Sequence, residues 1–378
     1  MGIKDLMKFV RETEEKYNSK NPTTPINHAK RITTDKFKYN RISVDGNLWL
    51  YTHMSIAQKG VINRTDLLEA EPDRNESFKI LLHIWLDAYL KWASAGILLI
   101  MCFDGTNPAQ KKKTLEKRTN TKKALQDKIT ELESKISETD LLEVSEADLE
   151  SLKNAKSNLT WVSKEEISKF KNILISLGIP CLTATGQGEK LCVSLVIDNV
   201  CTAALGKDSD MLAYGCKSIV RDLKSHGTNL AGETTYTVEE IDLSLILKLL
   251  NLEFKTFVDF CIGIQCDYNT RIKNYGPAKM YNLLSTHKNL ENIGLNIECL
   301  DVQFCRNEFK YSQYKNITES GTIELQNPTT EGYNLLCNYG LSDYYNKIAR
   351  VANELKLNSI TEGINIVGKP KIIFKKRT

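Results

Sequence analysis

Residues 96–105 read GILLIMCFDG, an uninterrupted apolar run that ends in an acid and a glycine. Two other stretches have the same form, RISVDG at residues 41–46 and CTAALGKDSD at residues 201–210. Short apolar runs separated by helical segments are typical of a parallel sheet that is covered on both faces. Further strands are expected at residues 178–183 and 218–223. The sequence therefore predicts an α/β fold with a parallel sheet at its centre.

Helices are expected between these strands, at residues 76–95, 164–177 and 189–199. Ser163 and Glu166 form a capping-box pattern at the start of the second of these helices.

The character of the sequence changes after residue 223. Residues 238–262 are rich in Leu, Ile and Phe and are expected to be helical. A polar turn and then Pro277 follow, and proline is favoured in the first turn of a helix. We therefore expect a helical hairpin over residues 267–284 and a last helix at residues 342–355.

The segment between residues 104 and 179 is long and highly charged. Its few apolar residues recur at helical spacing: Leu125, Ile129, Leu132 and Ile136. Because so few apolar side chains are not expected to form a core of their own, we expect either a protruding helical arm or a partly disordered segment. Residues 111–128 hold eight basic residues against two acidic ones, which suggests contact with a polyanion. The plainer interpretation of such a run is a solvated helix face.

The composition excludes several classes of protein. The chain has 378 residues, of which 41% are hydrophobic and 26% charged, so disordered, collagen-like and membrane proteins are not expected. The longest apolar run, near residues 95–103, is far shorter than a bilayer span. Ten cysteines without any C-x-x-C spacing indicate reduced thiols in an intracellular protein, without a zinc site or a disulfide framework. The net charge of +4 names no partner by itself.

Acidic residues follow three of the expected strands, at Asp45, at Asp104 and at Asp208 with Asp210. The carboxyl ends of parallel strands meet at one edge of a sheet, where ligands bind. Carboxylates gathered there repel one another unless they bind cations, and oxygen ligands favour Mg²⁺ or Mn²⁺ over zinc. A single aspartate at a strand end is more simply a turn or N-cap residue. Three in the same position favour a metal site of the two-ion kind that cleaves phosphodiesters.

These motifs resemble those of the flap endonuclease/XPG family of structure-specific 5′ nucleases along most of the chain. In family order, the matching segments are MGIKDL (1–6), VDGNLWLY (44–51), FDG (103–105) with Pro108, EKR (116–118), GEKLC (188–192), KDSDML (207–212), CIGIQCDY (261–268) and YGP (275–277). Each match is weak alone, but their order and spacing make the resemblance specific. Departures from the family pattern mark a divergent member, for which a virus is one candidate source.

The resemblance implies a parallel-sheet PIN-like nuclease core with a helical arch insertion and a C-terminal helix-two-turn-helix region. The implied domains are an N-terminal nuclease region (1–105), a helical arch (106–165), an internal nuclease region (166–265), a duplex-binding region (266–355) and a basic tail (356–378).

The resemblance also implies the metal ligands. One ion is expected near Asp45, Asp104 and Glu189, and the other near Asp208, Asp210 and Asp267. Gln187 stands where the family has another glutamate and is a further candidate ligand. Its amide removes one negative charge, which is expected to weaken cation affinity.

Contacts with DNA are implied in the same way. Lys111 and Arg118 match the basic pair that engages the scissile phosphate, and Arg can clamp a phosphate bidentately. Tyr51 matches an aromatic residue that stacks on the terminal base pair, although a core tyrosine is the plainer interpretation. The other expected DNA contacts are Gly2, Lys122, Lys123, Gln265, Arg271, Lys273, Gly276 and Lys279.

The expected helical hairpin departs from the family pattern at its potassium site. Asn274 replaces the first glycine of the family's G-I-G-P, and Arg271 stands where a small hydroxyl residue often contributes. Duplex binding is therefore expected at the hairpin, whereas K⁺ binding stays an open question.

The expected function is a Mg²⁺-dependent 5′ flap endonuclease with 5′→3′ exonuclease activity, which leaves 5′-phosphate products in DNA replication or repair. Its expected partner is DNA with 5′ flaps or a branched or nicked duplex, without a membrane and without a recognisable sliding-clamp box in residues 368–378. Its expected location is the nucleus or another site of DNA replication. The alternatives are a catalytically weakened DNA-binding paralogue, suggested by Gln187, and a PIN-like ribonuclease.

Overall fold

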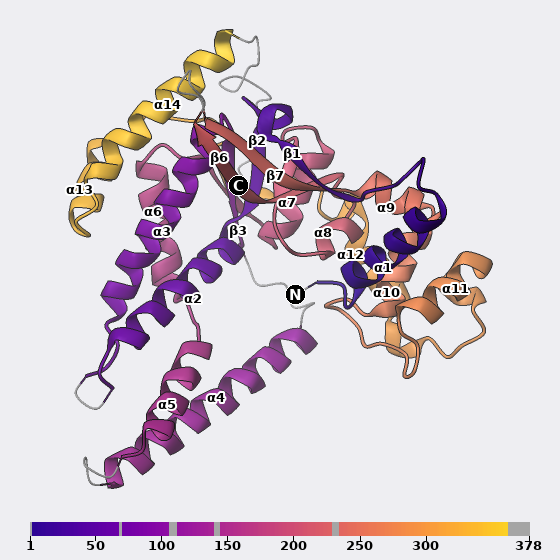
Figure 1. Cartoon of the computed structure of the whole chain (residues 1–378), viewed down its shortest axis with the longest axis horizontal. Helices are drawn as coiled ribbons and strands as arrows, with labels where there is room; N and C mark the ends of the chain where they lie inside the picture. The colour runs from indigo at the N-terminus through magenta and orange to yellow at the C-terminus, as the bar shows by residue number, and fades with distance from the viewer. Residues whose placement is uncertain (1, 68–69, 106–111, 140–143, 229–233, 362–378) are drawn as a thin grey trace, which may run out of the picture.

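The computed structural model describes residues 2–67, 70–105, 112–139, 144–228 and 234–361 (Figure 1). Lys111, Pro108 and most of the predicted basic tail lie outside these residues.

One eight-stranded sheet forms the centre of the described chain. Its strands, in spatial order, are β1 (Ala29–Thr33), β7 (Thr234–Asp242), β6 (Ser218–Thr228), β5 (Ala203–Leu205), β2 (Arg41–Asp45), β3 (Leu98–Phe103), β4 (Cys181–Ala184) and β8 (Thr318–Gly321). The five strands from β6 to β4 are parallel, whereas β1, β7 and β8 pair antiparallel at the two edges. The expected α/β fold with a parallel sheet is confirmed.

Helices surround this sheet (Figure 1). They are α1 (Leu6–Lys20), α2 (Gly46–Arg64), α3 (Arg74–Ser94), α4 (Lys112–Glu138), α5 (Glu146–Asn158), α6 (Lys164–Ser176), α7 (Gly188–Ile197), α8 (Asp210–Ala213), α9 (Leu243–Leu250), α10 (Phe254–Ile264), α11 (Pro277–His287), α12 (Val302–Phe309), α13 (Thr330–Cys337) and α14 (Asp343–Thr361). The predicted capping box is present, since Ser163 and Glu166 bond to each other's backbone N–H groups.

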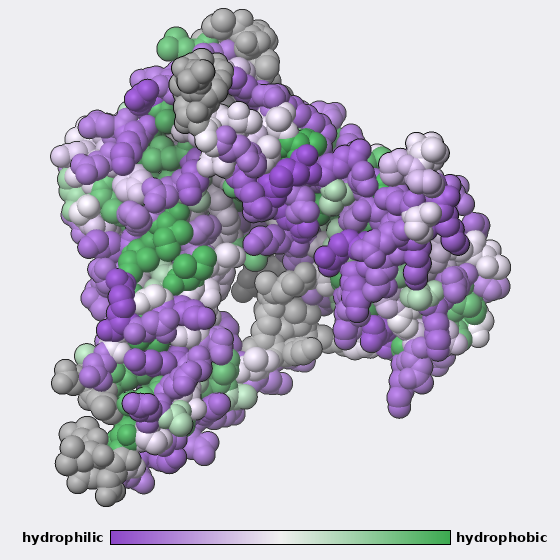
Figure 2. All heavy atoms as spheres, in the orientation of Figure 1, coloured by the Kyte–Doolittle hydropathy of each residue, from purple (hydrophilic) through white to green (hydrophobic). Residues whose placement is uncertain are grey.

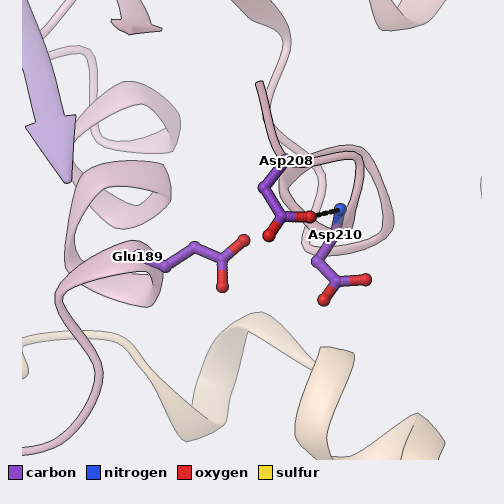
Figure 3. Close-up of side chains that lie close together, drawn as sticks. All are labelled: Glu189, Asp208 and Asp210. Carbon is purple, nitrogen blue, oxygen red and sulfur yellow. Dashed lines mark hydrogen bonds between the residues drawn. The ribbon is translucent and has the colours of Figure 1, made fainter. Parts of the chain in front are cut away.

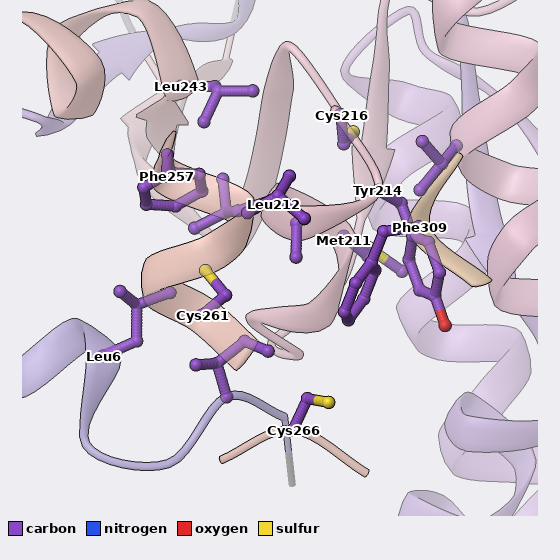
Figure 4. Packing of buried hydrophobic residues seen from close by; sticks show 14 of the residues in the cluster. Leu6, Met211, Leu212, Tyr214, Cys216, Leu243, Phe257, Cys261, Cys266 and Phe309 are labelled. Carbon is purple, nitrogen blue, oxygen red and sulfur yellow. The ribbon is translucent and has the colours of Figure 1, made fainter. Parts of the chain in front are cut away.

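Two large apolar clusters cover the two faces of the sheet. In β3, Ile100 and Cys102 belong to the first cluster, whereas Leu99 and Met101 belong to the second. The first cluster continues into the helices near the C-terminal half, as the packing around Leu212 shows (Figure 4). This alternation explains why the strand reads as a continuous apolar run, because both faces of β3 are buried.

The expected helix at residues 238–262 is wrong at its start and is interrupted. Residues 238–242 complete β7, whose β-branched stretch TTYTV pairs with β6. Asp242 then caps α9 by accepting hydrogen bonds from the backbone of Ser244 and Leu245. Asn251, in the left-handed region at φ 49°, separates α9 from α10.

The charged segment forms a helical arm made of α4 and α5, which projects from the rest of the molecule (Figure 1). The expectation that it has no core of its own is wrong, because Ile129, Leu152 and Ala155 are buried together in a small cluster. Lys135 Nζ also bonds to both carboxylate oxygens of Asp148 at 2.8 Å, which ties α4 to α5. A helical pair can bury a few apolar residues that a single amphipathic helix leaves exposed.

The segment from β8 to α14 packs back on the sheet. β8 extends the sheet beside β4. Residues Tyr344, Ile348, Ala352 and Leu355 of α14 belong to the second apolar cluster, and Tyr344 donates a 2.5 Å hydrogen bond to Asp87 of α3. Within the described residues, no helix has the length and apolar character needed to cross a membrane. All ten cysteines are free, and eight of them are buried.

Candidate metal centre

Four neighbouring parallel strands end at one edge of the sheet, and each is followed by an acidic residue. Asp45 ends β2, Asp104 follows β3, Glu189 lies in the first turn of α7 after β4, and Asp208 follows β5. Since adjacent parallel strands share their direction, the topology alone brings these four segments to the same edge.

Three carboxylates converge there: those of Glu189, Asp208 and Asp210 (Figure 3). One oxygen of each lies within 4.8 Å of the others. Glu189 is 7% exposed and Asp210 only 1%, so two of the three charges are withdrawn from water. The backbone N–H of Asp210 donates to Asp208 Oδ1 at 3.2 Å, which orients that carboxylate. A buried, all-oxygen set of like charges fits a hard divalent cation, which would neutralise their repulsion.

Asp104 and Asp45 are held by the scaffold beside this cluster. Asp104 Oδ1 accepts from the backbone N–H of Gly188 at 2.6 Å, and its Oδ2 accepts from Asn47 Nδ2 at 3.1 Å. Asp45 is the N-cap of α2 and accepts from the Leu48 N–H at 2.9 Å. The N-cap role that the sequence offered as the plainer interpretation is therefore present at Asp45. Each carboxylate oxygen has two lone pairs, so these bonds orient the groups without preventing cation binding.

Gln187 belongs to a buried chain of hydrogen bonds. Tyr268 Oη donates to Gln187 Oε1 at 3.3 Å and lies 2.5 Å from Tyr214 Oη. Burial raises the pKa of both tyrosines, and the nearby charges of Glu189 and Asp210 raise each further. Both hydroxyls therefore stay protonated at neutral pH, and Tyr214 donates to Tyr268 because Tyr268 uses its own proton on Gln187.

The beginning of the chain packs against the cluster. Gly2 has φ +106°, and a Cβ placed there would lie 2.1 Å from Asp208 Oδ1. Glycine is therefore required by both the backbone conformation and the close approach. The next turn is anchored to α10, since the Lys4 N–H donates to the carbonyl of Gln265 at 3.0 Å. Gln265 itself has φ 97°.

The other predicted site residues are spread over the arm, α2 and the hairpin. Arg118 lies in α4, and Lys122 and Lys123 are exposed on the same helix. Tyr51 is half-buried in α2 and packs against the second apolar cluster, with its hydroxyl 3.5 Å from the carbonyl of Val162. None of these observations assigns a contact with DNA.

The hairpin is formed by α10 and α11, with Pro277 in the first turn of α11, so its first helix ends before residue 267, where the predicted hairpin begins. Asn274 adopts φ 67°, so asparagine, which tolerates the left-handed region, stands at this position of the turn. Lys273 and Lys279 are exposed, and Gly276 is the N-cap of α11. Arg271 forms an ion pair with Asp5 at 3.4 Å, so a carboxylate of the protein itself already balances part of its positive charge. Asp267 is half-buried in the turn after α10.

Two protein-family models match this chain. The XPG N-terminal domain matches residues 1–125, and the XPG I-region matches residues 178–267, which together make up more than half of the chain. The chain belongs to the XPG family. The two matched regions contain all the acidic residues of the candidate metal centre, and α5 and the second half of α4 lie in the interval between them.

Relatives of the XPG chain include proteins named Flap endonuclease 1. The one from Plasmodium knowlesi (strain H) is 29% identical over 307 residues, covering 79% of this chain and 47% of the relative. The one from Theileria parva is 27% identical over 295 residues, covering 78% of this chain and 52% of the relative. The chain thus spans about half the length of the curated relatives it matches.

Solved structures share the fold of the XPG chain. Flap endonuclease-1 from Methanococcus jannaschii matches with a TM-score of 0.58 at 19% identity, covering 87% of this chain and 97% of that one. The catalytic core of Rad2 in complex with a DNA substrate matches with a TM-score of 0.57 at 19% identity, covering 94% and 100%. The expected nuclease fold is confirmed by these two likenesses.

Sequence reasoning missed several residues around the centre of this XPG chain. Lys190 Nζ forms a 2.6 Å ion pair with Glu308 Oε2, and both side chains are largely buried. The ammonium also lies 5.5 Å from the ring centroid of Tyr214 and 5.7 Å from that of Tyr268. The position of Lys190 directly after Glu189 was the one sequence signal that could have pointed to it. The ion pair could not be predicted, because Glu308 lies on the distant helix α12.

Proposed function

We propose that this chain is a structure-specific 5′ flap endonuclease with accompanying 5′→3′ exonuclease activity on DNA. The observation that carries the proposal is the cluster of Glu189, Asp208 and Asp210 at the carboxyl edge of an XPG-family sheet. The relatives named Flap endonuclease 1 support the choice of a 5′ flap as substrate. We infer that branched and nicked duplexes, which share with a 5′ flap an interruption in one strand of the duplex, are also bound.

The metal that fits this centre is Mg²⁺, with Mn²⁺ as a substitute. Glu189, Asp208 and Asp210 would hold it, with Asp45, Asp104 and Asp267 as further ligands of a two-ion site. When bound, the ions supply an activated water and neutralise charge on the phosphodiester. The Gly188 N–H and Asn47 fix the carboxylate of Asp104, and the Asp210 N–H fixes that of Asp208, so the protein prepares the ligand set before the metal arrives.

Basic residues would position the DNA. Arg118 and Lys111 would neutralise charge at the scissile phosphate, and Lys122 and Lys123 would contact the single strand from α4. Lys273 and Lys279 are exposed beside the α10–α11 turn, where they can contact the backbone of the duplex.

Four further expected contacts belong to this proposal: Gly2, Gln265, Arg271 and Gly276 would lie near the DNA. Tyr51 would stack on the terminal base pair. A K⁺ ion at the hairpin remains a proposal of the same kind. The substrate implies a role in replication or repair, in the nucleus or another site of DNA replication.

A labelled 5′-flap duplex tests the proposal. The chain should cut the flap in Mg²⁺ but not in EDTA, leave a 5′-phosphate, and spare a matched RNA hairpin. Asp222→Asn, which changes an exposed carboxylate on β6, should cut as the native chain does. Binding without cleavage in Mg²⁺ would instead favour the weakened paralogue, and cleavage of the RNA hairpin would favour the ribonuclease.

A further inference from the structure

Trp161 is an exposed aromatic side chain at the base of the helical arm. It lies in the connection between α5 and α6 and is 45% exposed, whereas the next residue, Val162, is buried in the second apolar cluster. A single exposed apolar residue needs no explanation by itself. The surroundings of the indole therefore decide what it can do.

Arg74 fixes the indole in one orientation. Its guanidinium carbon lies 4.1 Å from the ring centroid of Trp161, a cation–π contact, and its Nη2 donates to the Trp161 carbonyl at 2.6 Å. Arg74 also bonds to both carboxylate oxygens of Glu166 at 2.7 Å. Since Glu166 is held in turn by the capping box with Ser163, the ring is oriented before any ligand arrives.

Trp161 lines two pockets, as do Gln126 and Leu159. The first contains Arg74, and its lining also includes Lys156, whose charge is balanced by ion pairs with Glu71 and Glu133. The second, an open pocket of about 510 Å³, lies between α4 and the connection that carries Trp161. Arg74 does not line this second pocket, so the guanidinium does not fill it.

The second pocket combines an aromatic surface with positive charge. Lys122, Lys123 and Asp127 line it from α4, and Leu159 and Trp161 line it from the opposite side. Both lysines are exposed, and they outnumber the one acid. In Figure 2 the arm is a projection with hydrophilic residues over much of its visible surface, and its outer end points away from the lobe that carries α10 and α11. A DNA strand that passes beside α4 could therefore reach the second pocket.

We propose that this second pocket is a stacking subsite for one unpaired base of single-stranded DNA, with Trp161 as its platform and Lys122 and Lys123 as contacts to the adjoining phosphates. The subsite rests on the proposed function, because the strand it receives is the 5′ flap. Every base has a flat π-face, so an aromatic platform holds a strand without reading its sequence. Inside a duplex each base is already stacked on its neighbours, so an unpaired base is the one that is free to reach the platform.

Binding of flapped and flapless duplexes in EDTA tests the subsite without cleavage. Trp161→Ala should lower the affinity for the flapped duplex by about 5- to 100-fold, the range for loss of one base–aromatic stack, and leave the flapless duplex unchanged. A 2-aminopurine at one or two flap positions should be quenched by the native chain and not by this variant.

Two substitutions separate stacking from packing on Arg74. Trp161→Phe keeps an aromatic face and should retain most of the affinity and the quenching, whereas Trp161→Leu keeps apolar bulk and should behave as Trp161→Ala. Tyr333→Ala is the matched control, because Tyr333 is 42% exposed and lies on α13, remote from the arm in Figure 1.

Each failure has a distinct meaning. A Leu variant that binds and quenches as the native chain does, or equal losses on flapped and flapless duplexes, would overturn the stacking subsite. A native chain with no preference for the flapped duplex would overturn it too. Trp161-dependent flap binding without any Mg²⁺-dependent cleavage would overturn the proposed nuclease while the subsite stands.

Discussion

At the scale of single residues, Asp208 and Asp210 lie two positions apart in the acidic cluster, and Asp210 is its most buried member at 1% exposed. Asp208→Asn or Asp210→Asn should lower single-turnover cleavage by about 10²-fold or more, because each removes a charged ligand. Flap affinity in EDTA should stay the same or rise, because one repulsion with phosphate is lost. Single-turnover kinetics and fluorescence anisotropy measure the two effects. Cleavage at the native rate would show that the D-x-D element is structural.

Gln187 is a second test at the residue scale. Gln187→Glu should lower the Mg²⁺ concentration for half-maximal cleavage by about 3- to 10-fold, because it adds a charged oxygen two residues before Glu189. The fold should tolerate the change, since Tyr268 can donate to a carboxylate as it does to the amide. A Mg²⁺ titration of the cleavage rate measures this. Gln303→Glu on α12 is an exposed control, and an unchanged Mg²⁺ dependence for Gln187→Glu would place residue 187 outside the ligand set.

At the scale of elements, substitutions on α4 of the arm should distinguish residues that act in the cleavage step from residues that only bind DNA. Arg118→Ala should reduce single-turnover cleavage by about 10²-fold with little change in flap affinity, because a contact formed with the developing charge acts in the chemical step. Lys122→Ala and Lys123→Ala should instead weaken binding and each lower the slope of log affinity against log salt by about 1. If all three variants lose the same affinity for the flap and cleave bound DNA at the native rate, Arg118 has no role in the cleavage step.

The hairpin depends on one buried charge pair. Arg306 of α12 bonds to Asp259 of α10, which is 1% exposed, and to Glu291 after α11. Arg306→Met should lower the free energy of unfolding by about 3–5 kcal/mol, because it leaves a buried carboxylate without its cation. Urea unfolding measures this. Arg350→Met, which breaks an exposed pair with Glu354, should cost at most about 1 kcal/mol.

The ion pair between Arg306 and Glu291 should also make the stability of the protein depend on pH in acid. Arg306 lowers the pKa of Glu291, so the stability that this carboxylate contributes is present above its unfolded pKa and is lost as the pH falls through its folded pKa. The difference in the free energy of unfolding between the native chain and Arg306→Met should therefore become smaller below about pH 4. A difference that stays constant down to pH 3 would show that Glu291 contributes nothing.

At the scale of the whole molecule, the central sheet is completed by the far end of the described chain. A chain that ends before Thr318 should fail to fold, because it loses β8 and the buried face of α14. Each large apolar side chain there contributes about 1.5–3 kcal/mol, against a net stability of about 5–15 kcal/mol. Far-UV circular dichroism and thermal unfolding measure this. A chain that ends after residue 361 keeps every described residue and is the control; a folded, cooperative shorter chain would contradict the prediction.

Much of the fold could be predicted from local patterns. The strands near residues 41–46 and 96–105, the capping box at Ser163 and the proline that begins α11 all depend on neighbours within a few positions. The same local pattern, an apolar run followed by an acidic residue, marks the ends of β2, β3 and β5. The parallel topology then brings these acidic residues to one edge of the sheet. This pattern named Asp45, Asp104, Asp208 and Asp210, whereas Glu189, Gln187 and Asp267 were implied only by the family resemblance. The ligand roles of all these residues and the DNA contacts stay predictions.

Tertiary structure alone decided which groups meet. The three carboxylates that converge within 4.8 Å come from α7 and from the segment after β5, Gly2 lies against Asp208, and Lys190 pairs with Glu308 across 118 positions of sequence. Trp161 likewise became a candidate platform only because Arg74, 87 positions away, fixes its ring. Local patterns cannot supply such pairs, because burial and charge compensation depend on side chains that only the folded chain brings together.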